Sequence, residues 1–163
     1  MRRMPMIGLA LALSLAACGS GHETASQVAL QKRSDTLAIE QIEVNWHKAS
    51  STKDIDLMMS LWAEDATFTA GTTTYTGKAQ IRDFFLTKAA PFKPENHWVS
   101  DTPEYKLRVT VDGDTGTLYF QCHYVDVATM ELKNVVAADQ DVARINGRWL
   151  ITKSVASTAI LSP

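Results

Sequence analysis

Four strand-like segments follow one another in the second half of the chain, and this succession limits the possible folds most strongly. The segments cover residues 104–111, 117–127, 134–144 and 149–156, and β-branched and aromatic residues recur in them. The linkers between them are short, and two of them contain the hairpin dipeptides Asp-Gly and Asn-Gly. Consecutive hairpins of this kind predict an antiparallel meander rather than a parallel sheet.

Three helices are predicted before this meander. The first spans about residues 34–50, the second residues 55–62 with Asp54 as its N-cap, and the third ends before Pro91. Between the second and third helices, residues 66–70 predict a short strand and residues 72–74 a turn. The first and third helices carry apolar residues at helical spacing, namely Ala38, Ile39, Ile42, Trp46, Ala49, Ile81, Phe84 and Phe85. Helices followed by antiparallel strands indicate a single α+β domain over residues 34–163.

The N-terminus carries the features of an export signal. Arg2 and Arg3 precede an apolar stretch from Met6 to Ala17, which is shorter than the roughly 20 residues that cross a bilayer. The sequence Leu-Ala-Ala-Cys ending at Cys18 resembles the bacterial lipobox. This resemblance implies cleavage after residue 17, lipid attachment to Cys18 and a membrane-anchored, exported lipoprotein. A plain signal peptide with an incidental cysteine and a short core helix are the alternatives.

The segment after Cys18 predicts a flexible tether over residues 18–33, because Gly19-Ser20-Gly21 is small and polar. Loss of residues 1–17 would leave 14 of the 16 Lys and Arg residues against 18 Asp and Glu, a net charge of about −4. Attachment to the membrane would therefore depend on acyl chains rather than on charge. With Gly19 after the cysteine, the anchor is expected in the outer membrane facing the periplasm if the host has two membranes, and otherwise at the cell surface.

Composition and motifs exclude several classes of function. No basic stripe is present, so nucleic acid is not an expected partner. No spacing of His, Cys and carboxylate residues predicts a metal site, and no glycine-rich loop predicts a nucleotide cofactor. Cys122 would be the only thiol of the lipidated chain, and a buried apolar role is expected for it. His47 follows the apolar stripe of the first helix by one position, and His97 lies beside Trp98 in a loop.

The segment 117–127 is apolar on both faces. Leu118, Phe120, Cys122 and Tyr124 alternate with Tyr119, His123 and Val125. One face would then line a cavity while the other contacts a second copy of the chain, which predicts a homodimer through the sheet. Packing within a monomer is the alternative.

Several of these segments together resemble the nuclear transport factor 2-like superfamily, in its SnoaL-like branch. The resemblance rests on residues 46–49, 53–54, 61–68 and 75–85 and on the final hairpin at residues 146–151. It implies a cone-shaped fold, in which a bent antiparallel sheet closes over three helices and encloses a hydrophobic cavity. The fold hosts isomerases, cyclases, dehydratases and binding modules, so the resemblance alone does not fix the function.

The resemblance also allows the acid–base positions of the superfamily's ketosteroid isomerases to be placed on this chain. Their oxyanion-hole tyrosine corresponds to Trp46, their base to Ala70 and their supporting tyrosine to Phe85. None of these three side chains can do the corresponding proton chemistry. Asp141 corresponds to the strand aspartic acid, with Asp139 as the alternative because the turn length differs.

Two hypotheses about function follow. In the first, the domain is a non-catalytic module that binds a hydrophobic small molecule or assembles an envelope complex. The ligand side chains would be aromatic: Trp46, Phe68, Tyr75, Phe85 and Tyr124. In the second, Asp141 or Asp139 faces the cavity as the general acid or base of a cyclase, isomerase or dehydratase. Each hypothesis has a structural alternative. The aromatic residues could form only the core of the domain, and both carboxylates could face water.

Overall fold

The computed structural model of the protein describes residues 24–158, which form three α-helices, two 3-10 turns and seven strands. The predicted signal peptide and Cys18 lie outside the described residues. In chain order the elements are α1 (Ala25–Thr52), α2 (Ile55–Ser60), β1 (Trp62–Ala70), β2 (Thr73–Thr76), α3 (Lys78–Thr87), η1 (Ala90–Phe92), β3 (Trp98–Asp101), η2 (Glu104–Lys106), β4 (Arg108–Asp112), β5 (Thr115–Asp126), β6 (Leu132–Ile145) and β7 (Arg148–Thr158). No helix within residues 24–158 is long and apolar enough to cross a membrane.

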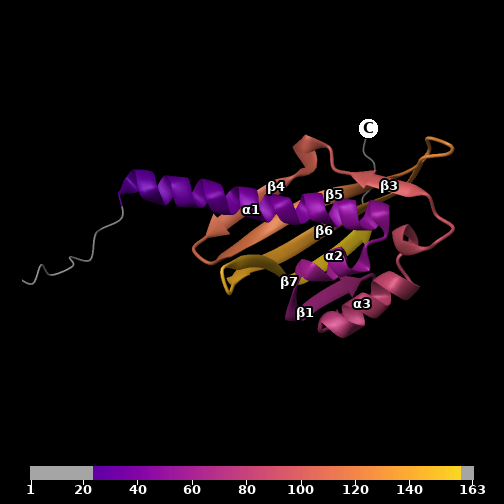
Figure 1. Cartoon of the computed structure of the whole chain (residues 1–163), viewed down its shortest axis with the longest axis horizontal. Helices are drawn as coiled ribbons and strands as arrows, with labels where there is room; N and C mark the ends of the chain where they lie inside the picture. The colour runs from indigo at the N-terminus through magenta and orange to yellow at the C-terminus, as the bar shows by residue number, and fades with distance from the viewer. Residues whose placement is uncertain (1–23, 159–163) are drawn as a thin grey trace, which may run out of the picture.

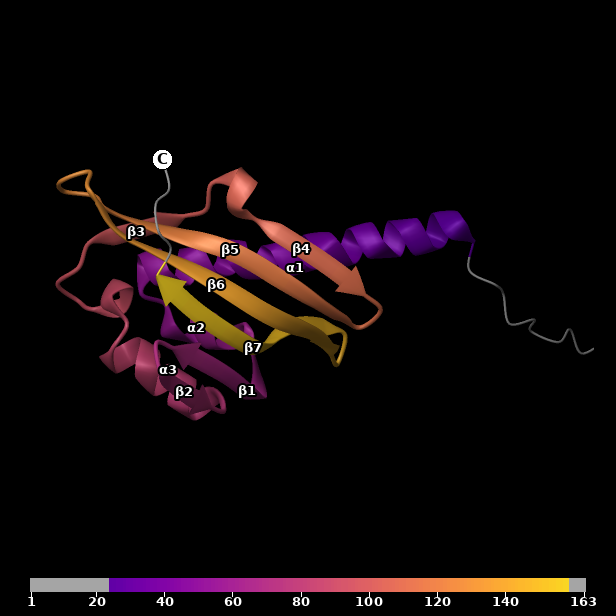
Figure 2. The ribbon, with the colours of Figure 1, turned by 180° about the vertical axis from the view of Figure 1, so that it is seen from behind.

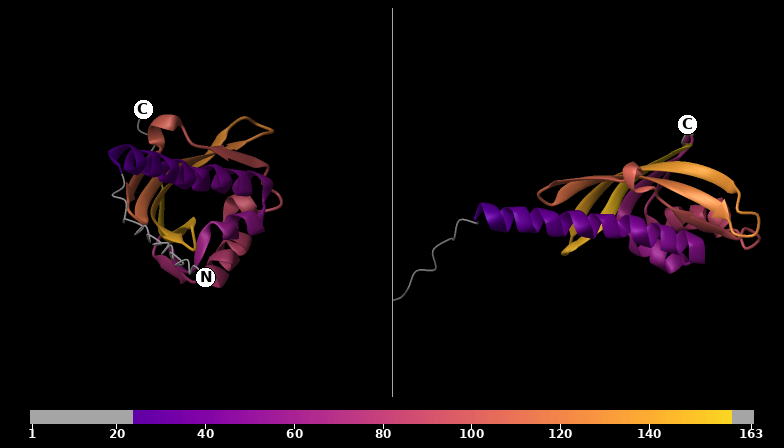
Figure 3. Two further views of the ribbon diagram at one scale, coloured as in Figure 1. Left: turned by 60° about the vertical axis from the view of Figure 1, so that its left-hand side comes forward. Right: turned by 90° about the horizontal axis from the view of Figure 1, so that it is seen from above.

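The seven strands form one curved sheet that does not close on itself. Its order is β2-β1-β7-β6-β5-β3, and β4 also pairs with β5. The predicted meander is confirmed for β4 to β7, whose pairs are all antiparallel. The sheet is nevertheless mixed, because β1 runs parallel to β7. Figures 1 and 2 show the two sides of this sheet, and the left view of Figure 3 shows it curving around a common interior with the helices.

Helix α1 begins nine residues earlier than the pattern of apolar residues predicts. Thr24 and Gln27 form a capping box that fixes its start, and the segment 25–33 is therefore helical rather than a flexible tether. At the other end, Lys53 adopts a left-handed conformation and Asp54 N–H donates to Ala49 O. The N-terminal end of α1 projects beyond the sheet (Figure 1).

Short elements account for the other differences from prediction. Helix α2 ends at Ser60, and Trp62, predicted within that helix, begins β1 and pairs with Ile151 of β7. The sequence pattern did not predict β2 and β3, which have four residues each. Their pairing partners β1 and β5 are long, so neighbouring strands rather than local sequence define these two edges.

Alternation along β5 separates the two faces of the sheet as predicted. Leu118, Phe120, Cys122 and Tyr124 are buried on the inner face, toward the helices. The outer face at the same level is mixed, with Arg108 stacked 3.8 Å over the Tyr119 ring and Gln121 Nε2 donating to Tyr119 Oη at 2.8 Å. The large residues of the outer face are thus engaged with one another.

A buried carboxylate joins the middle of α1 to the end of the sheet. Asp35 is only 4% exposed and contacts Arg144 at 2.6 Å, while Trp149 Nε1 donates to it at 3.3 Å. Burial raises the pKa of Asp35, but the hydrogen bonds from Arg144, Gln31 and Trp149 outweigh it and the net pKa is lowered. The carboxylate is therefore held ionised in the packed structure.

Candidate functional site

The inner face of the sheet and the helices enclose a cavity of about 330 Å³. Its wall comes from α1, β1, α3, η1, β5, β6 and β7. This volume lies at the lower end of the range for small-molecule sites. The lining residues are Trp46, Ser50, Phe68, Ala70, Gly71, Phe84, Phe85, Lys88, Ala89, Ala90, Pro91, Phe92, Cys122, Tyr124, Asn134, Val136, Ala138, Ser154, Ala156 and Ser157.

Burial distinguishes the deep end of the cavity from its mouth. Trp46, Ser50 and Cys122 are each no more than 5% exposed. Lys88 and Ser157, in contrast, are exposed. A ligand would therefore enter past the C-terminal end of α3 and lie with its innermost atoms against α1 and β5.

Two side chains at the deep end have polar atoms without a partner. Trp46 Nε1 and Ser50 Oγ are buried and make no hydrogen bond of ordinary geometry within the described part of the chain, although both side chains lie close to that of Tyr124. They lie four residues apart on α1, which places them on one side of the helix. Both atoms have almost no accessible surface, and an unpaired buried donor costs about 1–3 kcal/mol, so an acceptor that reached either atom would offset this cost.

Two further groups beside these donors stay protonated. Burial raises the pKa of the Cys122 thiol to about 12, and it raises the pKa of the Tyr124 hydroxyl well above its usual value. Neither group is therefore an anionic nucleophile or a base near neutral pH. The described residues at the deep end therefore offer hydrogen-bond donors and no anion.

Among residues 24–158, no aspartate, glutamate or histidine lines the cavity. Asp139 and Asp141, the predicted acid–base residues, lie on the outer face of β6 and are exposed. Asp141 Oδ2 is 3.8 Å from Lys153 Nζ. The residues between and beside them, Ala138 and Gln140, are buried toward the interior, so strand alternation directs both carboxylates outward.

Four of the five predicted ligand residues line the cavity: Trp46, Phe68, Phe85 and Tyr124. Tyr75 does not line it, because it packs behind Phe68 and Phe84 at centroid distances of 6.1 and 5.0 Å. Ser50 is not among the predicted ligand residues, although its position four residues after Trp46 on a predicted helix places it beside the indole.

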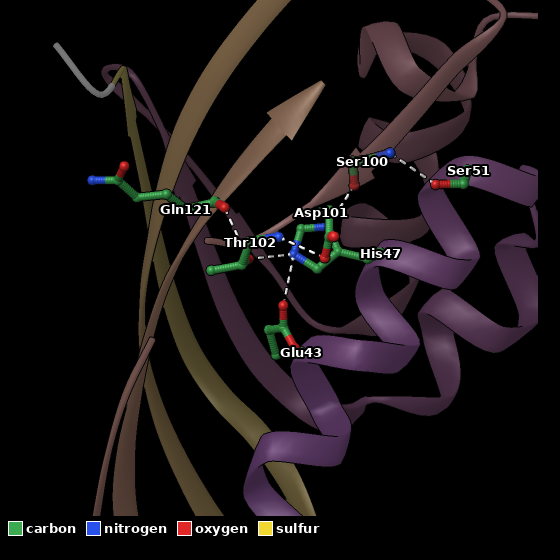
Figure 4. A network of polar contacts seen from close by, with 7 residues as sticks. All are labelled: Glu43, His47, Ser51, Ser100, Asp101, Thr102 and Gln121. Carbon is green, nitrogen blue, oxygen red and sulfur yellow. Dashed lines mark hydrogen bonds and ion pairs between the residues drawn. The ribbon is translucent and has the colours of Figure 1, made fainter. Parts of the chain in front are cut away.

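A second polar cluster, the His47 network, lies outside the cavity lining (Figure 4). His47 and Glu43, both on α1, are 6% and 7% exposed, and Nε2 of His47 is 3.0 Å from Glu43 Oε1. Nε2 also lies 2.6 Å from Thr102 Oγ1, and Nδ1 lies 2.5 Å from Ser100 Oγ. His47, predicted at the edge of the apolar stripe, is therefore a buried polar residue.

The hydrogen bonds of this network assign the histidine tautomer. Thr102 Oγ1 donates to Gln121 O at 2.8 Å, so it accepts from His47 Nε2–H, as the Glu43 carboxylate does. In the neutral ring, Nδ1 then accepts from Ser100 Oγ–H. The network links α1 to β3 and the segment after it, and this is a packing role.

Comparison with known proteins gives the same architecture. A family model described as a SnoaL-like domain matches residues 31–155. No curated protein matches the chain.

Solved structures extend this comparison. An NTF2-like protein with a cystatin-like fold from Novosphingobium aromaticivorans is 19% identical, with a TM-score of 0.71 over 87% of this chain and 94% of that one. A hexachlorocyclohexane dehydrochlorinase from Novosphingobium barchaimii is 17% identical, with a TM-score of 0.67 over 83% and 93%. An NTF2-like protein of unknown function from Pseudomonas putida is 15% identical, with a TM-score of 0.67 over 78% and 89%. At these identities the likeness shows the fold, the predicted cone of helices and curved sheet.

Proposed function

The chain belongs to the SnoaL-like domain family, and we propose that its cavity binds a hydrophobic small molecule without acid–base catalysis. One observation carries this proposal: the part of the cavity wall that the structure describes has unpartnered buried donors and no carboxylate or imidazole. General acid–base catalysis needs a group that exchanges a proton near the working pH. The Cys122 and Tyr124 hydrogens are held too tightly for this role, since burial raises both pKa values.

The geometry also favours a particular ligand chemistry. Aromatic rings of Trp46, Phe68, Phe85 and Phe92 form much of the wall, which suits a flat apolar body. Trp46 Nε1–H is a donor only, so its partner must be an acceptor such as a carbonyl or ether oxygen. The ligand class is thus an aromatic or polycyclic molecule with an acceptor oxygen at one end.

Replacing Trp46 with phenylalanine tests the indole's role as a donor. The probes are 2-acetylnaphthalene and 2-isopropylnaphthalene, which have similar shapes and differ in the carbonyl oxygen. We expect the intact chain to bind the ketone about fivefold more tightly, as one net hydrogen bond implies, and the variant to lose this preference. Isothermal titration calorimetry measures both affinities.

Trp62→Phe is the matched control. The Trp62 indole N–H is also buried without a partner, but Trp62 does not line the cavity. This variant should keep the preference for the ketone. Failure of both probes to bind the intact chain, or equal preferences in all three proteins, would refute the proposed cavity function.

We further propose that the domain is exported and anchored through lipid on Cys18. The support is the sequence alone: two arginines, an apolar stretch and the four residues that end at Cys18. Mass spectrometry of the protein purified from its native membrane should find residue 18 as the N-terminus, with its mass increased by acyl chains. An unmodified Cys18, or a mature chain starting elsewhere, would contradict the anchor.

A further inference from the structure

Helix α1 carries an apolar stripe on the side away from the core. Leu30, Leu37 and Val44 are 68%, 58% and 51% exposed. They are spaced seven residues apart, so an α-helix brings them to nearly the same side. The buried residues Ile39, Ile42 and Trp46 occupy the opposite side of the same helix. Exposed leucines are ordinary singly, but a row along one helix face indicates a contact surface.

Two opposite charges border this stripe on one edge. Arg33 and Glu40 are also seven residues apart, and helical geometry places both on the same flank of Leu37. Neither forms an ion pair with another residue of the described chain from 24 to 158. When two such helices lie antiparallel, the positive charge of one stripe therefore comes beside the negative charge of the other.

We propose that α1 pairs antiparallel with α1 of a second copy of this chain, with the twofold axis at Leu37. In this arrangement Leu30 lies against Val44 of the second copy, and Arg33 lies beside Glu40 of the second copy. The symmetry repeats both contacts, as an isologous interface requires. A parallel pair would instead bring like charges to the same level, which disfavours it.

The position of α1 leaves this surface open to a partner. The N-terminal end of the helix projects past the sheet, and the right view of Figure 3 shows α1 along the side of the molecule opposite the sheet. Three apolar side chains per copy form a much smaller contact than the roughly 800 Å² per partner of standard interfaces. The pair is thus a weak dimer, which membrane anchoring of both copies would favour by raising their local concentration.

Disulfide trapping tests the register. In the full chain carrying Cys18→Ser, Leu37→Cys places one thiol from each copy at the twofold axis, whereas Cys122 is buried. Mild oxidation should give a cross-linked dimer, quantified by non-reducing electrophoresis. Ala38→Cys is the control, since residue 38 is exposed but turned about 100° from the stripe. It should give little cross-linked dimer.

Charge exchange tests the orientation. In the Leu37→Cys chain, Arg33→Glu or Glu40→Arg alone should lower the yield of cross-linked dimer at least threefold, because each creates like-charged pairs. Arg33→Glu together with Glu40→Arg should restore it. Equal yields in all four proteins, as a dimer through the outer face of the sheet would give, overturn the proposal. Failure of the double variant to recover overturns it as well. Binding of 2-acetylnaphthalene reports on the cavity separately.

Discussion

Replacing Ala138 with phenylalanine is expected to lower affinity for 2-acetylnaphthalene by about 100-fold or more. Ala138 is 2% exposed, lines the cavity and pairs with Phe120 on β5 and Ala156 on β7. A phenyl ring at this position would project into the space that the ligand needs. The same ring fills empty apolar volume, so the melting temperature should stay unchanged or rise. Calorimetric titration and thermal unfolding measure the two effects.

Ala143→Phe is the control for this substitution. Ala143 lies on the outer face of the same strand, is half-buried and pairs with Thr115 and Leu150. Its affinity for the ketone should remain within about twofold of that of the unaltered chain, because the cavity wall is unchanged. If Ala138→Phe folds and binds the ketone as tightly as the unaltered chain does, the ligand does not occupy this cavity.

The sequence predicts those helices and strands in which apolar residues recur with a regular helical or strand spacing. The hairpin dipeptides after β4 and β6 predicted the antiparallel meander correctly. The alternation along β5 correctly separated the residues of its two faces. The resemblance to SnoaL-like proteins correctly implied that the sheet is curved and covered by helices. The parallel pairing of β1 with β7 is a contact between distant segments, so no local pattern contains it.

The start of α1 could have been predicted more closely. Thr24 and Gln27 are a capping pair, but they precede a segment whose outward residues include Val28 and Leu30, so no clean amphipathic stripe marks it. The predicted polar tether therefore extends to residue 33, nine residues into the observed helix. That part of α1 projects beyond the sheet, and burial did not shape its pattern.

The sequence predicted most of the aromatic residues that line the candidate site, but it did not predict the polar atoms at its deep end. Large aromatic residues at helical or strand spacing face the interior in any packing of these elements. Four of the five predicted positions therefore line the cavity. Asp139 and Asp141 could not be assigned a face until the register of β6 was known, since a shift of one residue reverses it. Two of the three partners of His47, Ser100 and Thr102, lie 53 and 55 residues away, beyond any local pattern.

Replacing His47 with alanine is expected to lower the free energy of unfolding by about 3 kcal/mol. The change leaves the Glu43 carboxylate, 7% exposed, without its partner 3.0 Å away, and it removes the contacts to Ser100 and Thr102. A buried carboxylate left without its hydrogen-bond donor costs more than the net value of the original hydrogen bond, because its desolvation is no longer offset. For a domain of this size the melting temperature should fall by roughly 10 °C. Urea unfolding followed by circular dichroism measures the free energy.

A double-mutant cycle separates the pair from simple loss of packing. If the cost of His47→Ala comes from the unpaired carboxylate, adding Glu43→Gln should recover at least about 1 kcal/mol, because a neutral amide is less costly to bury than a charge. Lys48→Ala, an exposed change on the same helix, should cost less than about 0.5 kcal/mol. A loss below 1 kcal/mol for His47→Ala would mean that the His47 network does not hold α1 against β3. Full additivity of the two changes would instead assign the loss to packing around Phe120, whose ring centroid lies 5.5 Å from that of the imidazole.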